Sequence, residues 1–262
     1  MKKIAIVGYG YVGKSMFNFF KDHYDVYICD PTYEKSNTKE EINDCDMAVV
    51  CVPTPQGETG AVDTTIVEEV IGWLQVPLIL IKSTIPPKTT KGLKDKFNKR
   101  IVFSPEYIGE GKYQVQWWKD KAYPHPTDMK MHDFFIFGGD KEDTPEMIQY
   151  FLKVVGPDPK YIQTDSTTAE LVKYMENSWG AMKVAFCNEF ADIADTFDVN
   201  YEELREMWLL DGRVERMHTA VFRDQRGFGG KCFPKDVNGI IEHSIKHGYE
   251  PELLMKVIKR SL

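Results

Sequence analysis

The stretch KIAIVGYGYVG, residues 3–13, decides the fold of this chain. It joins a short apolar run to a glycine pattern of the form G-x-G-x-x-G, at Gly8, Gly10 and Gly13. An apolar run of this length is typical of a strand buried on both faces of a parallel sheet, and the residues after it have the apolar spacing of a helix. A strand, a glycine-rich turn and a helix in this order predict a nucleotide-binding unit, with phosphate groups on the helix N-terminus.

The next predicted strand, residues 24–30, ends in an acidic side chain. Asp30 lies 30 − 13 = 17 residues after Gly13, close to the spacing of about 20 residues at which a carboxylate accepts hydrogen bonds from the adenosine ribose. Because a carboxylate repels a 2′-phosphate, and Pro31 stands where an arginine would favour NADP, the pattern predicts NAD. The alternative is a glycine-rich turn in an unrelated α/β fold. The predicted cofactor-binding residues of this turn are Gly8, Gly10, Tyr11, Val12, Gly13 and Asp30.

The rest of the chain divides into a part with alternating strands and helices and a part with helical patterns. The first part predicts right-handed crossovers and a doubly wound parallel sheet. Residues 165–197 contain one glycine and no proline, which predicts a single long helix. We therefore expect a Rossmann-type NAD-binding domain over residues 1–164 and a mainly helical domain over 165–262. The predicted strands are 3–7, 24–30, 47–52, 77–82, 100–103 and 133–137, and the predicted helices are 11–21, 64–74, 87–97, 165–197, 202–210 and 234–247.

The composition excludes several classes of protein. The 262 residues include 33 Lys+Arg and 40 Asp+Glu, and the net charge of −7 argues against a nucleic-acid partner. The sequence contains neither a run of about 18 apolar residues nor a secretory leader, so we expect a cytoplasmic protein with no membrane partner. Five cysteines without a C-x-x-C pair argue against a disulfide framework and against zinc. His243 and His247 lack a third ligand nearby, so no metal is predicted.

The stretch GGKCFPKD, residues 229–236, contains a candidate nucleophile. Pro234 predicts the first turn of a helix, which places Cys232 just before a helix N-terminus, between Lys231 and Lys235. Both the helix N-terminus and the lysines favour the thiolate, which is the nucleophilic form of cysteine. The alternative is a cysteine that packs as a small buried apolar side chain.

The chain also contains a series of short motifs, which are Gly8 to Gly13, Cys51-Val52-Pro53-Thr54-Pro55, Lys82-Ser83-Thr84-Ile85-Pro86, Ser104-Pro105-Glu106, Glu110-Gly111, Ala169-Glu170-Leu171, Lys173-Tyr174, Asn177, Asn188-Glu189 and Gly229 to Asp236. These motifs occur in the order seen in the UDP-glucose/GDP-mannose dehydrogenase family, and over nearly its whole length the chain resembles the first two domains of that family.

The resemblance implies a four-electron oxidation of a nucleotide-sugar primary alcohol, such as that of UDP-glucose, to the carboxylate. This reaction uses two NAD and passes through a thioester on the cysteine, which is Cys232 here. Lys173 and Asn177, four residues apart on one helix face, would stabilise an oxyanion. By the same resemblance, Thr84, Glu110 and Asp236 would order water and transfer protons. Each of these polar residues also has an ordinary structural interpretation, as a loop, helix-surface or helix-terminus residue.

The resemblance extends to binding residues and to assembly. It implies a homodimer through the helix 165–197, with Arg213 reaching the substrate of the neighbouring subunit, and a place in nucleotide-sugar metabolism and polysaccharide biosynthesis. Further predicted cofactor contacts are Val52, Pro53, Thr54, Thr84, Glu110 and Lys235, and predicted substrate contacts are Glu106, Lys173, Asn177, Arg213, Gly227 and Gly229.

The chain departs from the family pattern at two places. Gly109 stands where the family has an arginine, and residues 112–133 diverge. The family continues into a third domain that closes over the nucleotide of the substrate, whereas this sequence ends in the helix that would lead there, so we expect that domain to be lacking. The sequence does not select one nucleotide sugar.

Two other functions are compatible with the sequence. A single-step β-hydroxyacid dehydrogenase combines similar domains with a Lys-x-x-x-Asn pair but needs no nucleophilic cysteine. A non-catalytic NAD-binding or regulatory protein would bind NAD without producing NADH from UDP- or GDP-sugars.

Overall fold

A computed structural model describes residues 1–108, 128–230 and 232–261, and these divide into two compact units. The first unit comprises residues 1–55 and 63–173, and the second comprises residues 56–62 and 174–262. In the part of the chain that is described, no helix is both long and apolar enough to span a lipid bilayer.

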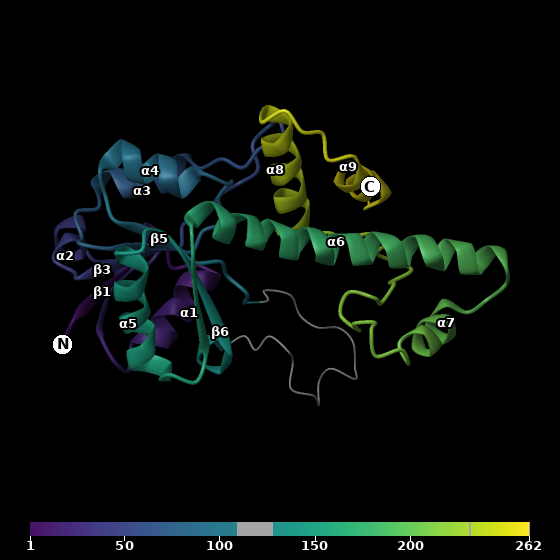
Figure 1. The fold of residues 1–262 in the computed structure, drawn as a ribbon, viewed down its shortest axis with the longest axis horizontal. Helices are drawn as coiled ribbons and strands as arrows, with labels where there is room; N and C mark the ends of the chain where they lie inside the picture. Colours follow the sequence, from purple (N-terminus) through teal and green to yellow (C-terminus); the bar gives the residue numbers. More distant parts are fainter. Residues whose placement is uncertain (109–127, 231, 262) are drawn as a thin grey trace. The chain divides into compact units, whose positions relative to one another are not determined.

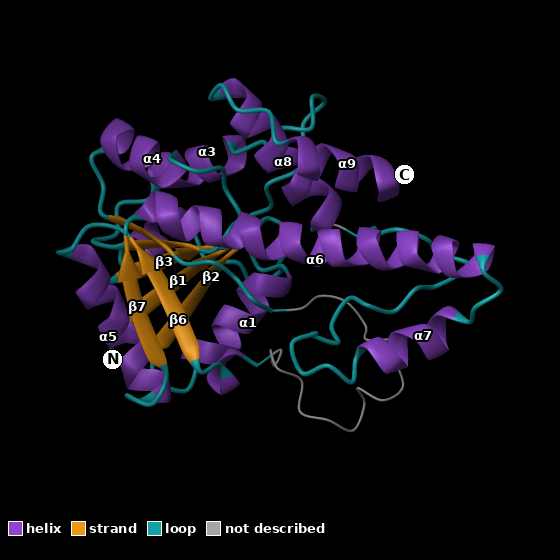
Figure 2. Ribbon diagram, turned by 45° about the vertical axis from the view of Figure 1, so that its right-hand side comes forward, coloured by secondary structure: helices purple, strands orange, loops and turns teal. Residues whose placement is uncertain are grey.

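The first unit is built on a seven-stranded sheet of order β2-β1-β3-β4-β5-β6-β7, counted over the described residues (Figures 1 and 2). β1 to β5 are parallel, β6 is antiparallel to β5, and β7 is parallel to β6. The fold class is therefore the predicted Rossmann-type one. The strands are β1 (Lys3–Val7), β2 (Asp25–Cys29), β3 (Met47–Val50), β4 (Ile79–Ile81), β5 (Ile101–Phe103), β6 (Phe134–Gly138) and β7 (Lys160–Thr164).

Helices cover both faces of this sheet, which explains why its central strands are apolar throughout. One face packs alternate strand residues such as Ile4 and Ile6 against α1 and α5, and the other packs Ala5 and Val7 against α2, α3 and α4. The helices of this unit are α1 (Tyr11–Phe20), α2 (Lys39–Asn43), α3 (Thr65–Trp73), α4 (Thr89–Phe97) and α5 (Asp143–Val155), with a 3₁₀ turn at Met129–Met131.

The second unit is helical and has two small apolar cores. The predicted long helix is confirmed as α6 (Ser166–Thr196), whose first turns belong to the first unit. Gly180 on α6 gives room for the ring of Phe233, since a Cβ at this position would lie 2.6 Å from the ring. Gly239 in the same way gives room for Val62, in the short segment that joins this unit. The remaining helices are α7 (Tyr201–Trp208), α8 (Phe233–Lys246) and α9 (Glu252–Ser261).

Glu170, near the start of α6, holds the start of α4. Its fully buried carboxylate accepts hydrogen bonds from the amides of Lys88 and Thr90, at 2.7 and 2.8 Å, and from Thr90 Oγ1 at 2.6 Å. Thr167 and Glu170 have the sequence spacing of a capping box, but the Glu170 carboxylate binds the start of α4, and Asp165 instead accepts the Thr168 amide at 2.9 Å. Burial raises the pKa of Glu170 to about 7, although these donors favour the charged form.

We expect Glu170→Ala to lower the free energy of unfolding by about 3 kcal/mol, because three donors, two of them buried, lose their acceptor. Urea unfolding followed by circular dichroism measures this loss. The matched control is Glu69→Ala, at an exposed position on α3, which should change stability by no more than about 0.5 kcal/mol. Equal losses in the two variants would contradict the capping role.

The same group gives the wild-type protein a pH dependence of defined sign. Because the pKa of Glu170 is raised, from 4.5 to about 7, the folded state binds more protons than the unfolded state between these values. The part of the stability that comes from proton binding by Glu170 is therefore fully present below pH 4.5 and is lost as pH rises through 7. Glu170→Ala should lack this contribution.

Candidate active site

The glycine turn after β1 uses its three glycines in different ways. Gly8 has φ +91°, and a Cβ there would lie 2.8 Å from the carbonyl group of Cys51. A Cβ on Gly13 would overlap the carbonyl oxygen of Gly8. Gly10, the N-cap of α1, has an ordinary extended conformation, and a Cβ added to it would meet nothing within 4 Å. The fold therefore requires Gly8 and Gly13, whereas Gly10 leaves open space at the helix N-terminus.

Asp30 lies beside this turn, as the sequence predicted. Its carboxylate accepts hydrogen bonds from the Tyr9 amide at 2.6 Å and from the amide and hydroxyl of Thr32 at 2.8 and 2.6 Å. Burial alone would raise the pKa of Asp30, but these donors and Lys14 hold it below its usual value. A carboxylate kept ionised and half-exposed has acceptor capacity left for ribose hydroxyl groups.

The other predicted residues of the first unit follow the carboxyl ends of neighbouring strands. Thr54 comes after β3, Thr84 after β4 and Glu106 after β5, and these three strands are parallel. The carboxyl ends of parallel strands lie along one edge of the sheet, where ligands bind in doubly wound folds. Ser83 Oγ donates to the carbonyl of Val52 at 2.6 Å and so joins the first two segments. Val52 and Thr54 are buried, Pro53 is exposed and Thr84 is half-buried.

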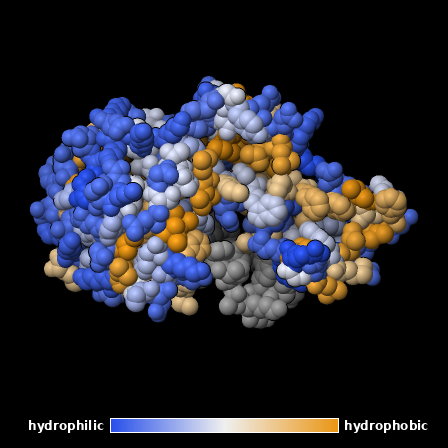
Figure 3. Space-filling model, in the orientation of Figure 1, coloured by the Kyte–Doolittle hydropathy of each residue, from blue (hydrophilic) through white to orange (hydrophobic). Residues whose placement is uncertain are grey.

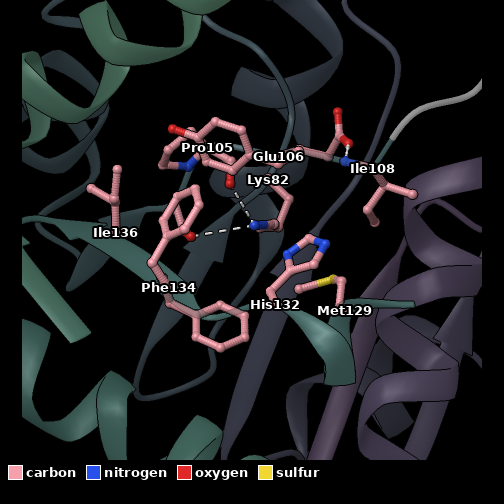
Figure 4. Close-up of a pocket in the computed structure, with 11 residues that line it drawn as sticks. Lys82, Pro105, Glu106, Ile108, Met129, His132, Phe134 and Ile136 are labelled. Atoms are coloured by element: carbon pink, nitrogen blue, oxygen red, sulfur yellow. Dashed lines mark hydrogen bonds between the residues drawn. The ribbon is translucent and has the colours of Figure 1, made fainter. Parts of the chain in front are cut away.

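Two lysine side chains donate hydrogen bonds to the segment 104–106. Lys173 Nζ donates to the Glu106 carbonyl at 2.5 Å and lies 3.6 Å from its carboxylate. Lys82 Nζ donates to Pro105 O at 2.8 Å and to Ser104 Oγ at 3.3 Å (Figure 4). No role was predicted for Lys82 from the sequence, although a charged residue at the end of the apolar run LILIK was a usable signal.

In the second unit, Cys232 is exposed at the N-cap of α8. None of the chain's five cysteines, all within the described residues, is in a disulfide. One turn into α8, the carboxylate of Asp236 is 1% exposed and accepts hydrogen bonds from Asn177 Nδ2 and Lys235 Nζ, both at 2.5 Å. The structure thus brings together three residues that the sequence places on α6 and α8.

The glycine loop before Cys232 is anchored within its own unit. Gly227 has φ +76°, its amide donates to Asn188 Oδ1 at 3.2 Å, and a Cβ there would lie 2.6 Å from the Ser261 carbonyl oxygen. Gly229 is exposed, with nothing within 4 Å of where a Cβ would be. The conformation at Gly227 is therefore explained by internal packing, and Gly229 is the glycine that leaves space for a ligand.

Other predicted residues are not part of these clusters. The side chain of Arg213 is 90% exposed and pairs with Asp211. Glu110 lies outside the described residues. Among the residues that are described, no group of three or more His, Cys, Asp or Glu side chains could hold a metal ion, and His247 Nδ1 lies 2.8 Å from the His243 carbonyl.

Comparison with known proteins matches two regions of the chain to one protein family. Residues 30–121 match the NAD binding domain of the UDP-glucose/GDP-mannose dehydrogenase family, and residues 167–260 match the central domain of the same family. A UDP-glucose 6-dehydrogenase of Rickettsia felis is 30% identical over 233 residues, which are 84% of this chain and 48% of that protein. A UDP-N-acetyl-D-mannosamine dehydrogenase of Methanococcus maripaludis is 29% identical, over 92% of this chain and 62% of that protein.

Solved structures agree on the fold. A UDP-glucose dehydrogenase from Pyrobaculum islandicum superposes with a TM-score of 0.81 at 24% identity, over 100% of this chain and 68% of that chain. The chain spans about half the length of the curated UDP-glucose 6-dehydrogenases it matches.

Proposed function

Because the chain belongs to the UDP-glucose/GDP-mannose dehydrogenase family, we propose that it takes part in the NAD-dependent oxidation of a nucleotide-sugar primary alcohol to the carboxylate. The observation that carries the proposal is the exposed Cys232 at the start of α8, in the same unit as the buried group formed by Asn177, Lys235 and Asp236. The proposed domains are the NAD-binding domain, residues 1–164, and the helical domain with the cysteine loop, residues 165–262.

The residues around the glycine turn fit NAD. The open space over Gly10 suits the approach of a diphosphate to the N-terminus of α1, and the ionised Asp30 suits ribose hydroxyl groups. When bound, NAD accepts one hydride in each of the two oxidations. Val52, Pro53 and Thr54 are proposed to contact it along the edge of the sheet, and Glu110 and Lys235 are the further proposed contacts.

Cys232 is proposed to carry the sugar between the two oxidations. Its thiolate forms a C–S bond to the aldehyde carbon, and the aldehyde oxygen becomes the anion of a thiohemiacetal. Lys173 and Asn177 are proposed to donate hydrogen bonds to this oxyanion. Departure of the carbon-bound hydrogen with its electron pair then leaves a thioester.

Hydrolysis of the thioester completes the proposed reaction. Water attacks the thioester carbon, the C–S bond breaks, and the thiolate of Cys232 leaves as the carboxylate forms. Asp236, Thr84 and Glu110 are proposed to order this water and to transfer its protons. Glu106, Arg213, Gly227 and Gly229 are the further proposed contacts to the substrate.

The number of NADH formed per sugar tests the proposal. With purified chain, NAD and UDP-glucose, followed by a panel of other UDP- and GDP-sugars, absorbance at about 340 nm gives NADH, and chromatography gives the sugar consumed. Two NADH per sugar with a carboxylate product is the expected result. One NADH per sugar would indicate a single-step dehydrogenase, and NAD binding without NADH would indicate a non-catalytic protein.

We also propose that the chain forms a homodimer through α6. Exposed apolar side chains follow one another on α6 at spacings of three, four or seven residues, which places them on one narrow stripe of the helix. Figure 3 shows apolar side chains over the α7 end of α6, on the right of the view. The stripe consists of Met175, Trp179, Phe186, Phe190 and Ile193 on α6 and Phe197 directly after it, and Trp208 of α7 lies against Phe186.

A charge within this stripe should separate the dimer. We expect Phe190→Glu to convert a particle with the mass of two chains into one with the mass of a single chain, because a carboxylate would be buried without a partner in the interface. Light scattering after size-exclusion chromatography measures the mass. Glu176→Lys, at an exposed position of α6 outside the stripe, is the control and should remain dimeric. A wild-type chain that is monomeric at micromolar concentration would overturn the dimer.

A further inference from the structure

Lys82 is a buried lysine that has no role in the reaction proposed above. It follows β4 at the edge of the sheet where the predicted ligand-binding residues lie, and it is only 4% exposed. Burying an ammonium group is costly, so a buried lysine is expected to satisfy particular acceptors or charges. An apolar side chain at position 82 would continue the apolar run of β4 with a smaller free-energy cost of burial.

The acceptors of Lys82 lie in the segment between β5 and Glu106. Its ammonium donates to Ser104 Oγ and to the Pro105 carbonyl. Lys173, from α6, donates to the next carbonyl along the chain, that of Glu106. Two lysines from different elements therefore hold consecutive carbonyl groups, and the Glu106 carboxylate accepts the Ile108 amide beyond them. These bonds fix both the backbone and the side chain of Glu106.

The charged groups that act on Lys82 include the side chain of Glu106. The titratable groups that face it within the described chain are Glu106, Cys51 and Lys173, and Tyr107 and His132 line the same pocket. Burial lowers the pKa of Lys82 to about 8, with Lys173 acting in the same direction and Glu106 and Cys51 acting against it. The cavity volume is about 10 Å³, room for no more than one water, so protein groups rather than solvent must stabilise the ammonium (Figure 4).

We propose that Lys82 is a positioning residue, which acts through the Ser104–Glu106 backbone and through its charge to hold Glu106 and its partner Lys173 in their working arrangement. The inference rests on the proposed function, in which Glu106 and Lys173 contact the substrate. It predicts that deprotonation of Lys82 weakens turnover on the alkaline side of neutrality and alters the environment of the Glu106 carboxylate at the same pH.

Lys82→Met tests the inference, because methionine keeps much of the side-chain length and removes the charge and both hydrogen bonds. Lys99→Met is the matched control. The Lys99 ammonium also donates to backbone carbonyls, those of Ile71, Gly72 and Leu74 at the end of α3, and burial lowers its pKa as well. Both variants lose stability, but only Lys82→Met changes the groups around Glu106.

Two readouts decide the outcome. We expect Lys82→Met to lower kcat about 30- to 100-fold, the size of effect that a displacement of about 1 Å produces, with KM for NAD within about twofold and no alkaline limb near pH 8. Lys82→Arg, whose guanidinium stays charged, should restore part of kcat and also lack that limb. Lys99→Met should keep both the wild-type kcat and the limb.

The second readout does not need activity. In protein with ¹³C-labelled glutamate, the Glu106 carboxyl signal is assigned by its loss in Glu106→Gln. In wild type and in Lys99→Met, the chemical shift of this signal should change near pH 8, as Lys82 loses its proton. The shift should be absent in Lys82→Met. A shift that persists in Lys82→Met, or a kcat within twofold of wild type, would overturn the inference. A wild-type chain that forms no NADH but shows the shift would overturn the proposed function and leave the coupling of Lys82 to Glu106 established.

Discussion

Cys232→Ser will abolish the formation of carboxylate while NAD still binds. A serine hydroxyl is a far weaker acid than a thiol, so the nucleophilic anion needed for the second oxidation is hardly populated at neutral pH. The loss of turnover should be at least about 10⁴-fold, comparable to the removal of a nucleophile in other covalent enzymes. The exposure of Cys232 at the start of α8 means that the substitution leaves the packing of the unit intact.

The measurement combines steady-state NADH formation with an NAD titration. Cys187→Ala is the control, because Cys187 is buried in the core beside α7 and should affect stability without affecting turnover. A Cys232→Ser variant with the wild-type rate would overturn the thioester route and favour a single hydride transfer.

Gly13→Ala should lower the stability of the protein, whereas Gly10→Ala should keep its stability and weaken NAD binding. A Cβ at Gly13 would overlap the carbonyl oxygen of Gly8, so the turn between β1 and α1 must shift. The expected loss of stability is about 3 kcal/mol, typical of forced overpacking, and NAD binding should be lost with it. Gly10→Ala meets nothing within 4 Å and keeps an allowed φ of −74°. Its stability should change by less than about 1 kcal/mol.

The Gly10 variant is the informative one for function. If the cofactor diphosphate lies over this turn, the added methyl group occupies its place, and the Kd for NAD should rise at least about tenfold, or about 1.4 kcal/mol. Thermal unfolding and calorimetric titration of the two variants separate the effects. NAD affinity unchanged in Gly10→Ala would remove the diphosphate from this turn.

The parts of the fold with a strong local pattern could be predicted from the sequence. Strands β1 to β6 coincide with runs of mostly apolar residues, and α6 has neither a proline nor a second glycine to interrupt it. β7, with the sequence KYIQT, is an edge strand with partly exposed side chains and was not predicted, because it lacks an apolar run. α2 and α5 were also not among the predicted helices.

The candidate site shows the same division. Gly8, Gly13 and Asp30 belong to a pattern with a fixed spacing in the sequence, so spacing alone could identify them. Lys82 and Glu170 act on segments that are distant in sequence, Ser104–Pro105 and Lys88–Thr90, and only the folded chain brings these donors and acceptors together. Long-range hydrogen bonds of this kind produce no periodic pattern in the sequence from which they could be predicted.

Residues 56–62 belong to the second unit although they lie between two parts of the first, so no single cut in the chain separates the two units. The chain passes between the units after residues 55, 62 and 173, and Val62 packs against the space left by Gly239 of α8. A protein cut at any one position between Val62 and Gly239 would therefore leave each piece with an unfilled contact, the Val62 side chain in one and the space at Gly239 in the other. Residues 56–62 therefore belong with α8 when the chain is divided, and domain exchange within this family should transfer them along with the helices that receive them.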